Sequence, residues 1–260
     1  MGTRERRRRQ FAEREQLFLD KAQELIRHDG LLTLQMSRIA HACDYAIGTL
    51  YQHFASKEDL LVALATRSCL SRVELFESAA RWEGPTRERM LGVVLADLLI
   101  LRDQPEYFRL AQFVWTDVVW GAASADSRQR ALEASAPLSA VVDGIVVEAR
   151  ARGDLPANVT MAPAAMTIGP WAMCLGMYTL AQQEGLLDHH QVGNPYRLLL
   201  AHVQYLLNGY GWQPLFDPAD APALDALLER VCSGVFGATC DAAQPHSATS
   251  LLQDLLHGQA

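Results

Sequence analysis

A short stretch of the chain, residues 47–60, combines small residues with side chains that can donate hydrogen bonds to phosphate. Gly48 is small enough for its helix to approach a sugar-phosphate backbone closely. Tyr51 and His53 follow, and a phenol and an imidazole can both donate to phosphate oxygens. The pattern indicates a surface that contacts nucleic acid, if the chain brings these side chains to one face.

The same stretch continues into the predicted start of another helix. Ser56 and Asp59 have the spacing of a capping box, with Asp in place of the usual Glu. Lys57 falls in the first turn, where the helix dipole favours anions rather than cations. A phosphate bound at that helix end would explain the lysine. Taken one at a time, these side chains fit an ordinary solvated surface, and only their combination favours phosphate binding.

Two short helices are expected to position these residues. Residues 36–43 and 47–54 carry helical patterns on either side of a three-residue break. This arrangement predicts a helix-turn-helix, whose second helix can enter a major groove. Asp44 lies in the break and adopts the left-handed backbone region more readily than most residues. Leu50 and Phe54 are four residues apart and are expected to face the core.

Most of the remaining chain also shows the helical period, and almost none of it alternates. A bend is expected at Pro137, and helix ends are expected at Gly30 and Gly153. The fold class is therefore all-α, with an N-terminal three-helix helix-turn-helix domain followed by a larger helical bundle. Further helices are expected over residues 14–29, 56–80, 86–104, 105–121, 127–152, 160–181, 194–209 and 223–236.

The charge of the chain is unevenly distributed. The net charge of −7 by itself argues against a nucleic-acid-binding protein. Residues 1–60, however, hold ten Lys or Arg against nine Asp or Glu, a net charge of +1, and the remaining 200 residues carry −8. The basic start is either a solvated, disordered tail or an arm that contacts a polyanion locally. Its basic residues are Arg4, Arg6, Arg7, Arg8 and Arg9.

Cysteine usage and apolar runs bear on the compartment. The five cysteines are scattered, without a CxxC pair, which is typical of a reduced, cytoplasmic protein. The basic start leads into "FAEREQ" rather than an apolar run, so no signal peptide is expected. Residues 155–183 carry no charge, but Pro163, Pro170 and three threonines favour a buried helix over a membrane span. The cysteines are Cys43, Cys69, Cys174, Cys232 and Cys240.

The segment "IAHACDYAIGTLYQHFASKEDLL" resembles the DNA-binding signature of the TetR family of transcriptional repressors, I-A-x-x-A-G-V-S-x-G-T-L-Y-x-H-F-x-S-K-E-x-L. It covers under a tenth of the chain, but it is specific. Cys43, Asp44, Tyr45 and Ala46 stand where Ala, Gly, Val and Ser are usual, and the missing serine removes a hydroxyl that would contact phosphate. These departures concern the operator sequence rather than DNA binding itself. The matching residues are Ile39, Ala40, Gly48, Thr49, Leu50, Tyr51, His53, Phe54, Ser56, Lys57, Glu58 and Leu60.

The resemblance implies a set of DNA contacts. The first short helix would touch phosphate or a groove edge, the second would face bases, and the residues after it would hold phosphates. Ile47 occupies a position that is often polar and could touch a thymine methyl. The arm would reach the adjacent minor groove or backbone, an inference from its charge. The implied contacts are Ser37 and Arg38; Ile47, Gly48, Thr49 and Gln52 for bases; Tyr51, His53 and Lys57 for phosphates; and Arg6, Arg7, Arg8 and Arg9 for the arm.

The resemblance also implies that the larger part of the chain binds a small molecule. The expected domains are residues 1–60 for DNA binding, with the basic arm, residues 61–216 for ligand binding and dimerisation, and residues 217–260 for an extra helix and a weakly ordered tail. Pro170 would kink the uncharged helix by leaving the carbonyl of Met166 without its donor, and so open space beside it. An apolar or aromatic effector is expected, although each aromatic side chain also fits ordinary core. The expected pocket residues are Phe108, Phe113, Trp115, Trp120, Trp171, Cys174, Met177 and Tyr178.

Two late helices carry small and apolar stripes that could build a four-helix interface between two subunits. A two-fold dimer would place the two reading helices about one DNA turn apart, which predicts a palindromic operator. The expected interface residues are Met166, Met173, Leu199, Val203, Leu206 and Tyr210.

The leading hypothesis is a homodimeric repressor that binds double-stranded DNA, has no cofactor, and is released by a small molecule. The ligand would act through the long helix that starts at Ser56, by favouring a state that binds DNA poorly. An enzyme is the least favoured reading, because the chain has no GxSxG, HExxH, phosphate loop or dinucleotide fingerprint. The adjacent His189 and His190 fit a loop better than a metal site. The remaining alternative is a helical small-molecule-binding or structural protein without specific DNA readout.

Overall fold

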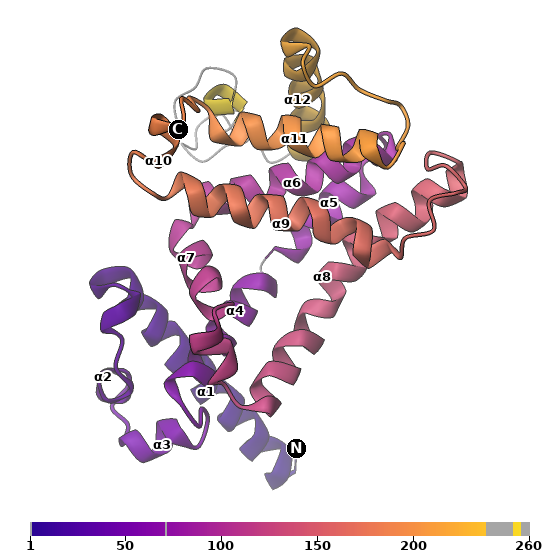
Figure 1. Ribbon diagram of the computed structural model, residues 1–260. Coiled ribbons are helices and arrows are strands. Elements are labelled where there is room, and N and C mark those ends of the chain that lie inside the picture. The colour runs from indigo at the N-terminus through magenta and orange to yellow at the C-terminus, as the bar shows by residue number, and fades with distance from the viewer. Residues whose placement is uncertain (1, 71, 238–251, 256–260) are drawn as a thin grey trace. The chain divides into compact units, whose positions relative to one another are not determined.

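The computed structural model describes residues 2–70, 72–237 and 252–255, and within these ranges every regular element is a helix (Figure 1). The all-α fold class is therefore confirmed. The chain divides into two compact units, of which the first combines Met1–Leu70 with Gln104–Ser135. The second combines Ser71–Asp103 with Ala136–Ala260. The expected boundary after residue 60 falls inside a helix of the first unit, and the functional roles of the domains stay predictions.

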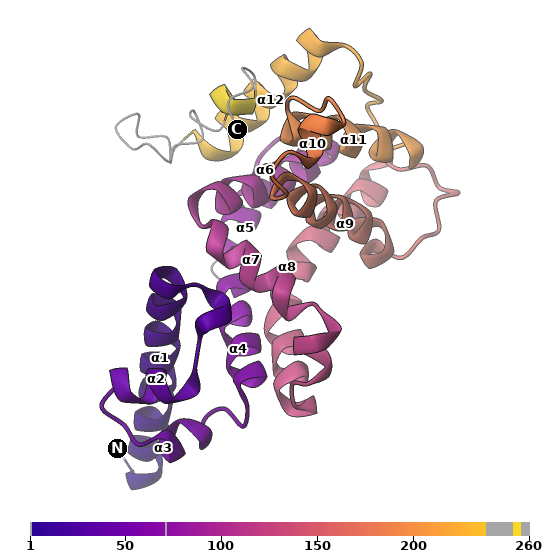
Figure 2. The same cartoon turned by 60° about the vertical axis from the view of Figure 1, so that its left-hand side comes forward.

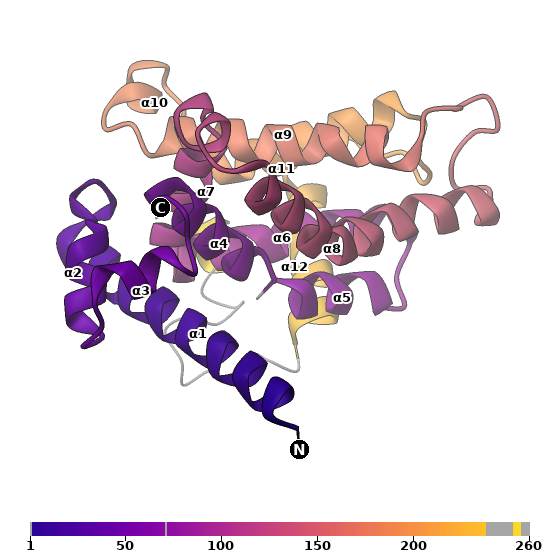
Figure 3. The ribbon, with the colours of Figure 1, turned by 90° about the horizontal axis from the view of Figure 1, so that it is seen from below.

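The first unit contains the predicted helix-turn-helix. Its α1 packs against α2 and α4 (Figures 2 and 3). Phe18, Leu50 and Leu60 are fully buried in its hydrophobic core, together with Val114 and Ala123 from the later segment. The elements are α1 (Thr3–Asp29), η1 (Leu31–Thr33), α2 (Met36–Ala42), α3 (Ile47–Tyr51), α4 (Lys57–Leu70), α7 (Pro105–Val114), the π-helix η2 (Asp117–Gly121) and the first turns of α8 (Ala125–Arg152).

The second unit is built around α6, whose apolar side chains Met90, Leu91, Leu95 and Leu98 are fully buried. The helices α5, α9, α11 and α12 all pack against α6. In Figures 1 and 3, α9 and α11 run side by side, as their mutual packing requires. The elements are α5 (Val73–Arg81), α6 (Thr86–Asp103), the rest of α8, α9 (Pro163–Ala181), α10 (Leu186–His189), α11 (Pro195–Gly209) and α12 (Ala221–Phe236).

The single helix predicted from Ser56 to residue 80 is wrong, because the structure has two helices there. α4 ends at Leu70 and α5 begins at Val73. The apolar pattern is continuous, but its partners change: α4 packs against α7 and η2 in the first unit, whereas α5 packs against α6 in the second. The helix divides where the chain leaves one unit for the other.

Helix ends follow local chemistry. Gly30 and Gly153 have φ values of 91° and 80°, and they end α1 and α8 as predicted, because glycine tolerates a positive φ. Asn194 caps α11 by accepting a hydrogen bond from the Arg197 amide at 3.0 Å. α9 begins at Pro163, not at Thr160.

The uncharged helix α9 accommodates Pro170 within its length. Proline cannot donate to the carbonyl of Met166, and the hydroxyl of Tyr210, directly after α11, instead donates to that oxygen at 3.4 Å. No helix in the described ranges is long and apolar enough to cross a membrane. Of the expected C-terminal tail, residues 252–255 are helical, and the Asn194 side chain donates to the Leu255 carbonyl at 2.9 Å. Most of the tail, with Cys240, lies outside the described residues.

A buried polar network joins the start of α6 to the end of α11. Arg87 is 2% exposed, and its guanidinium donates to the Gln204 side chain at 2.9 Å, to the Gln204 carbonyl at 2.9 Å and to the Trp212 carbonyl at 2.6 Å. The Trp212 indole donates to Thr86 at 2.9 Å, and the Thr86 hydroxyl donates to Asp154 at 2.6 Å. Three protein acceptors therefore replace the water that the Arg87 guanidinium loses on burial.

Candidate nucleic-acid interface

The turn between α2 and α3 is made by Asp44. Its φ is 58°, in the left-handed region, as its position in the break predicted. The Tyr45 amide then donates to the Ala40 carbonyl at 3.0 Å, which closes the turn back onto α2. The helix-turn-helix is therefore formed without the glycine usual at this position.

The short helix α3 presents a polar and small-residue face to solvent. Leu50 and Phe54 are buried and fix the helix on the core, as predicted. Ile47 and Tyr51 are 44% and 47% exposed, and Gln52 is also exposed. A Cβ added at Gly48 would have no neighbour within 4 Å, so this part of α3 borders open space. In Figures 1 and 2, α3 lies at the same end of the unit as the start of α1.

The first turn of α4 is capped only in part as predicted. The Asp59 amide donates to the Ser56 hydroxyl at 3.0 Å, which is the first half of a capping box. The Asp59 carboxylate does not complete the box. It is buried and accepts a hydrogen bond from the Ser124 amide at 2.7 Å. Lys57, half-buried, lies in this first turn.

His53 is placed differently from the expected phosphate contact. Its side chain is only 1% exposed and stacks on Phe11 of α1, with ring centroids 3.8 Å apart. Phe18 meets the same ring edge-on at 5.4 Å. The structure therefore does not support a phosphate contact by His53, because the imidazole fills a gap between α1 and the end of the reading motif. The sequence feature that could have indicated this burial is Phe11, an apolar residue in an otherwise polar part of α1.

Burial lowers the pKa of His53, against the opposing effect of Glu15, whose carboxylate is 3.7 Å away, and with a smaller lowering effect from Arg14. The unfolded chain then takes up a proton at higher pH than the folded chain, so folding stability falls as pH drops below the ordinary histidine value of about 6.5. We expect His53→Phe to flatten this loss between about pH 7 and pH 5, as measured by urea unfolding. His41→Phe, which replaces an exposed imidazole, is the control; an equal flattening there would contradict the prediction.

The basic arm is part of α1, which begins at Thr3, and the disordered-tail interpretation is wrong for the described residues. All arginines from Arg4 to Arg9 are exposed. Arg9 pairs with Glu13 at 2.8 Å, one turn further along the helix. Ser37 and Arg38, at the start of α2, are exposed too, and Arg38 pairs with Asp29 at 2.6 Å.

The eight residues expected to line an effector pocket fall into two groups, one in each unit. In the first unit, Phe108 is buried, Phe113 packs against the core, and the ring of the exposed Trp115 lies 4.9 Å from that of Trp120. In the second unit, the expected residues are the exposed Trp171, the half-buried Met177 and the buried Cys174 and Tyr178. A shared pocket stays a prediction.

Sequence reasoning missed a buried polar cluster in the second unit. Asp97 of α6 pairs with Arg72 at 3.2 Å. Burial raises the pKa of the Asp97 carboxyl, opposed by Arg72, and burial also raises the pKa of the nearby Cys174 thiol. The signal was present in the sequence as a lone carboxylate inside the apolar run "VVLADLLIL".

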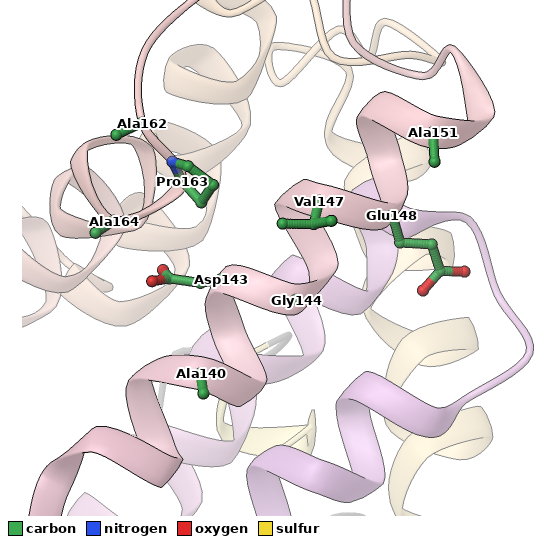
Figure 4. A pocket seen from close by; sticks show the side chains of 9 residues that line it. All are labelled: Ala140, Asp143, Gly144, Val147, Glu148, Ala151, Ala162, Pro163 and Ala164. Carbon is green, nitrogen blue, oxygen red and sulfur yellow. The ribbon is translucent and has the colours of Figure 1, made fainter.

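An open groove of about 600 Å³ lies between α8 and the start of α9 (Figure 4). Its walls are mainly small residues, and Asp143 and Val147 face Pro163 and Ala164 across it. Asp143 also accepts a hydrogen bond from the Thr167 hydroxyl at 2.8 Å. The predicted effector residues do not line this groove.

Three of the six expected dimer residues are covered by their own subunit. Met166, Leu199 and Val203 are fully buried in the second unit, so the structure does not support them as partner contacts. Met173, Leu206 and Tyr210 are half-buried. Gly169 packs closely on α11, where an added Cβ would lie 2.9 Å from Leu206. The stripe predicted for a partner thus serves the packing of α9 on α11.

Comparison with known proteins places the helix-turn-helix in a family. Residues 9–64 match the family described as bacterial regulatory proteins, tetR family. The chain is 26% identical over 137 residues, which are 53% of this chain and 68% of the relative, to a protein of Bacillus subtilis (strain 168) named fatty acid metabolism regulator protein.

Solved structures share the fold. A bacterial regulatory protein in the tetR family from Rhodococcus RHA1 matches with a TM-score of 0.54 at 17% identity, covering 76% of this chain and 97% of that one. The regulator FadR from Bacillus subtilis in complex with stearoyl-CoA matches with a TM-score of 0.54 at 20% identity, covering 75% and 98%. Residues 9–64, which include the signature around α3, therefore carry the DNA-binding domain of the tetR family of bacterial regulatory proteins, and about three quarters of the chain shares the helical fold of the solved structures.

Proposed function

We propose that the protein is a homodimeric repressor that binds a palindromic operator and is released from it by a small molecule with a long apolar chain. The observation that carries the proposal is the exposed face of α3, which the buried Leu50 and Phe54 hold outward after the turn at Asp44. A helix held in this way can enter a major groove and bring short side chains to base edges.

The proposed contacts divide into base readers and phosphate binders. Ile47, Gly48, Thr49 and Gln52 lie on α3 or directly after it and would face bases. The phosphate binders would be Tyr51 and Lys57 near the end of the reading motif, Ser37 and Arg38 on α2, and Arg6, Arg7, Arg8 and Arg9 on α1. His53 leaves this set, because its buried ring would act only by holding α1 in place.

Lys57→Ala is expected to weaken binding to operator and to random DNA about equally, by about fivefold to tenfold, because a phosphate contact carries no sequence information. The slope of log affinity against log salt should fall by about one. Lys21→Ala is the matched control, since Lys21 pairs with Glu24 on α1. An unchanged affinity and salt slope for Lys57→Ala would remove Lys57 from the proposed interface.

A second copy of the chain would cover the outward face of α9 and α11. Ile168 and Tyr205 on these helices are 56% and 51% exposed, and Trp171, about one turn along α9 from Ile168, is 43% exposed. Exposed apolar surface of this kind is typical of a subunit interface. These residues replace the buried members of the stripe expected from the sequence.

Ile168→Asp is therefore expected to shift the protein from dimer to monomer at micromolar concentration, because a carboxylate would be desolvated twice across a two-fold interface. Sedimentation velocity measures the change. Val118→Asp puts the same charge at an exposed apolar residue of the first unit and should leave the dimer intact. If Ile168→Asp remained dimeric, the interface would lie elsewhere.

The effector is proposed to be a long-chain fatty acyl thioester. The support is the apolar character of the second unit, together with the names of two similar proteins, one a fatty acid metabolism regulator and one solved with stearoyl-CoA. Stearoyl-CoA is expected to release the protein from DNA, whereas CoA alone should not. Release by neither would exclude this effector class without bearing on DNA binding.

The decisive experiment is selection from a random double-stranded DNA pool at moderate salt, with sequencing of the retained fraction. Enrichment of a palindrome would support a dimeric, specific regulator and would supply the duplex for effector titrations. If the folded dimer enriched no sequence, the chain would instead be a helical small-molecule-binding protein without specific DNA readout.

A further inference from the structure

The buried carboxylate of Asp59 joins two helices that are far apart in the sequence. It lies in the first turn of α4, is 4% exposed, and accepts a hydrogen bond from the Ser124 backbone amide at 2.7 Å. Ser124 directly precedes α8, so this amide has no acceptor within its own helix. A carboxylate at this place also complements the positive end of the α8 dipole. The hydrogen bond therefore gives the buried Asp59 carboxylate a donor and the Ser124 amide an acceptor.

The α8 end of this contact is firmly built. The Ser124 hydroxyl accepts from the Ser127 amide at 3.2 Å and so caps α8. One guanidinium nitrogen of Arg128 donates to the carbonyls of Trp120, Gly121 and Ala123 at 3.0, 3.3 and 2.9 Å. These bonds tie the end of the π-helix η2 to the first turn of α8. The amide that Asp59 binds is thus held at a defined place.

The first turn of α4, which holds Asp59, is anchored in the hydrophobic core and includes Lys57, a proposed DNA contact. Leu60 and Leu61, next to Asp59, are buried in the same core as Val119 and Ala123. Lys57 lies two residues before Asp59 in the same helical turn. A displacement of Ser124 relative to α4 would therefore strain the turn that positions the lysine.

The far half of α8 belongs to the second unit. Beyond Ala136 its residues Ile145, Val146 and Ala149 are fully buried, and Asp143 bonds Thr167 of α9. The 28-residue helix α8 thus has its first turns, next to the Asp59 contact, in the first unit and its residues from Ala136 onward in the second. Pro137, next to the division between the units, removes one hydrogen bond of this helix.

We propose that Asp59 is the positioning residue through which α8 and the DNA-contacting turn of α4 act on each other. The carboxylate touches no DNA itself; it transmits the position of the α8 N-terminus to Lys57 and the reading motif. This inference rests on the proposed function, because it concerns how DNA binding is coupled to the rest of the chain.

The test is hydrogen–deuterium exchange of the full chain, with and without a saturating DNA duplex taken from the selection. In the wild type, DNA is expected to slow exchange at the start of α8 by about fivefold, because it stabilises the turn that holds the Ser124 amide. Asp59→Ala should abolish this slowing. Asp59→Asn should retain most of it, since its amide oxygen can accept the same hydrogen bond.

Glu58→Ala is the matched control, because it removes the neighbouring carboxylate, which does not bind Ser124, and it should respond to DNA like the wild type. The proposal is overturned if folded Asp59→Ala shows the wild-type slowing, or if the DNA-saturated wild type shows none. A wild type that binds no duplex at low salt would be a failure of the proposed function, visible in the binding titration before any exchange is measured, and the coupling would fall with it.

Discussion

Replacing Arg87 with methionine is expected to lower the free energy of unfolding by about 4 kcal/mol. Methionine keeps most of the aliphatic volume but supplies no donor. The Gln204 side-chain oxygen and the Trp212 carbonyl would then be buried without the donor that Arg87 supplies, and the Gln204 carbonyl would keep only its bond within α11. Each such group costs about 1–3 kcal/mol, partly offset because the guanidinium no longer has to be desolvated.

Urea unfolding followed by circular dichroism measures this loss for Arg87→Met. Arg81→Met is the control, since Arg81 forms an exposed pair with Glu77 and should cost less than about 0.5 kcal/mol. Burial lowers the pKa of the Arg87 guanidinium to about 10, so it stays protonated in the folded chain at pH 6 and at pH 8. The loss should therefore be the same at both pH values, and a loss no larger than that of the control would mean that the network does not stabilise the unit.

Features that depend on neighbouring residues could be predicted from the sequence. Helical periodicity located the helices because the residues that share a helix face are three and four apart. Gly30, Gly153 and Asp44 were recognised from the backbone angles that these residue types tolerate. The signature around α3 likewise lies within one continuous segment, and the family match confirms it.

Features that depend on distant partners were missed. His53 was predicted to donate a hydrogen bond to phosphate, but Phe11, 42 positions earlier, stacks on its ring. Asp59 matched a local capping box, but an amide 65 positions later takes its carboxylate. The apolar stripe of α9 indicates that this face of the helix is buried, but it does not indicate whether the same subunit or a partner covers it. Met166 is buried within its own subunit.

The same distinction separates the two halves of the proposed function. The proposed base-reading side chains lie within one short segment, residues 47–52, and the fold adds only their outward orientation. The residues predicted for the effector site come from several helices, which no single stretch of sequence brings together. Identification of the effector therefore needs binding experiments, whereas DNA binding can be tested by single substitutions.

Replacing Gly48 with glutamate is expected to lower affinity for the operator by about 100-fold, or about 2.7 kcal/mol, and to leave the fold intact. A Cβ at this position meets nothing within 4 Å, and its φ is not positive, so the side chain would extend into solvent. In the proposed complex, this space is filled by DNA. The glutamate would clash with the duplex and bring a negative charge to its phosphates.

Gly144→Glu is the matched control, because Gly144 is also a helical glycine whose added Cβ would meet nothing within 4 Å, but it lies on α8 in the second unit. Both variants should unfold at or slightly above the wild-type midpoint, since glutamate has the higher helix propensity. Fluorescence anisotropy with the selected duplex then separates them, because only Gly48→Glu should lose binding. Wild-type affinity in the Gly48→Glu variant would mean that α3 is not the helix that approaches DNA.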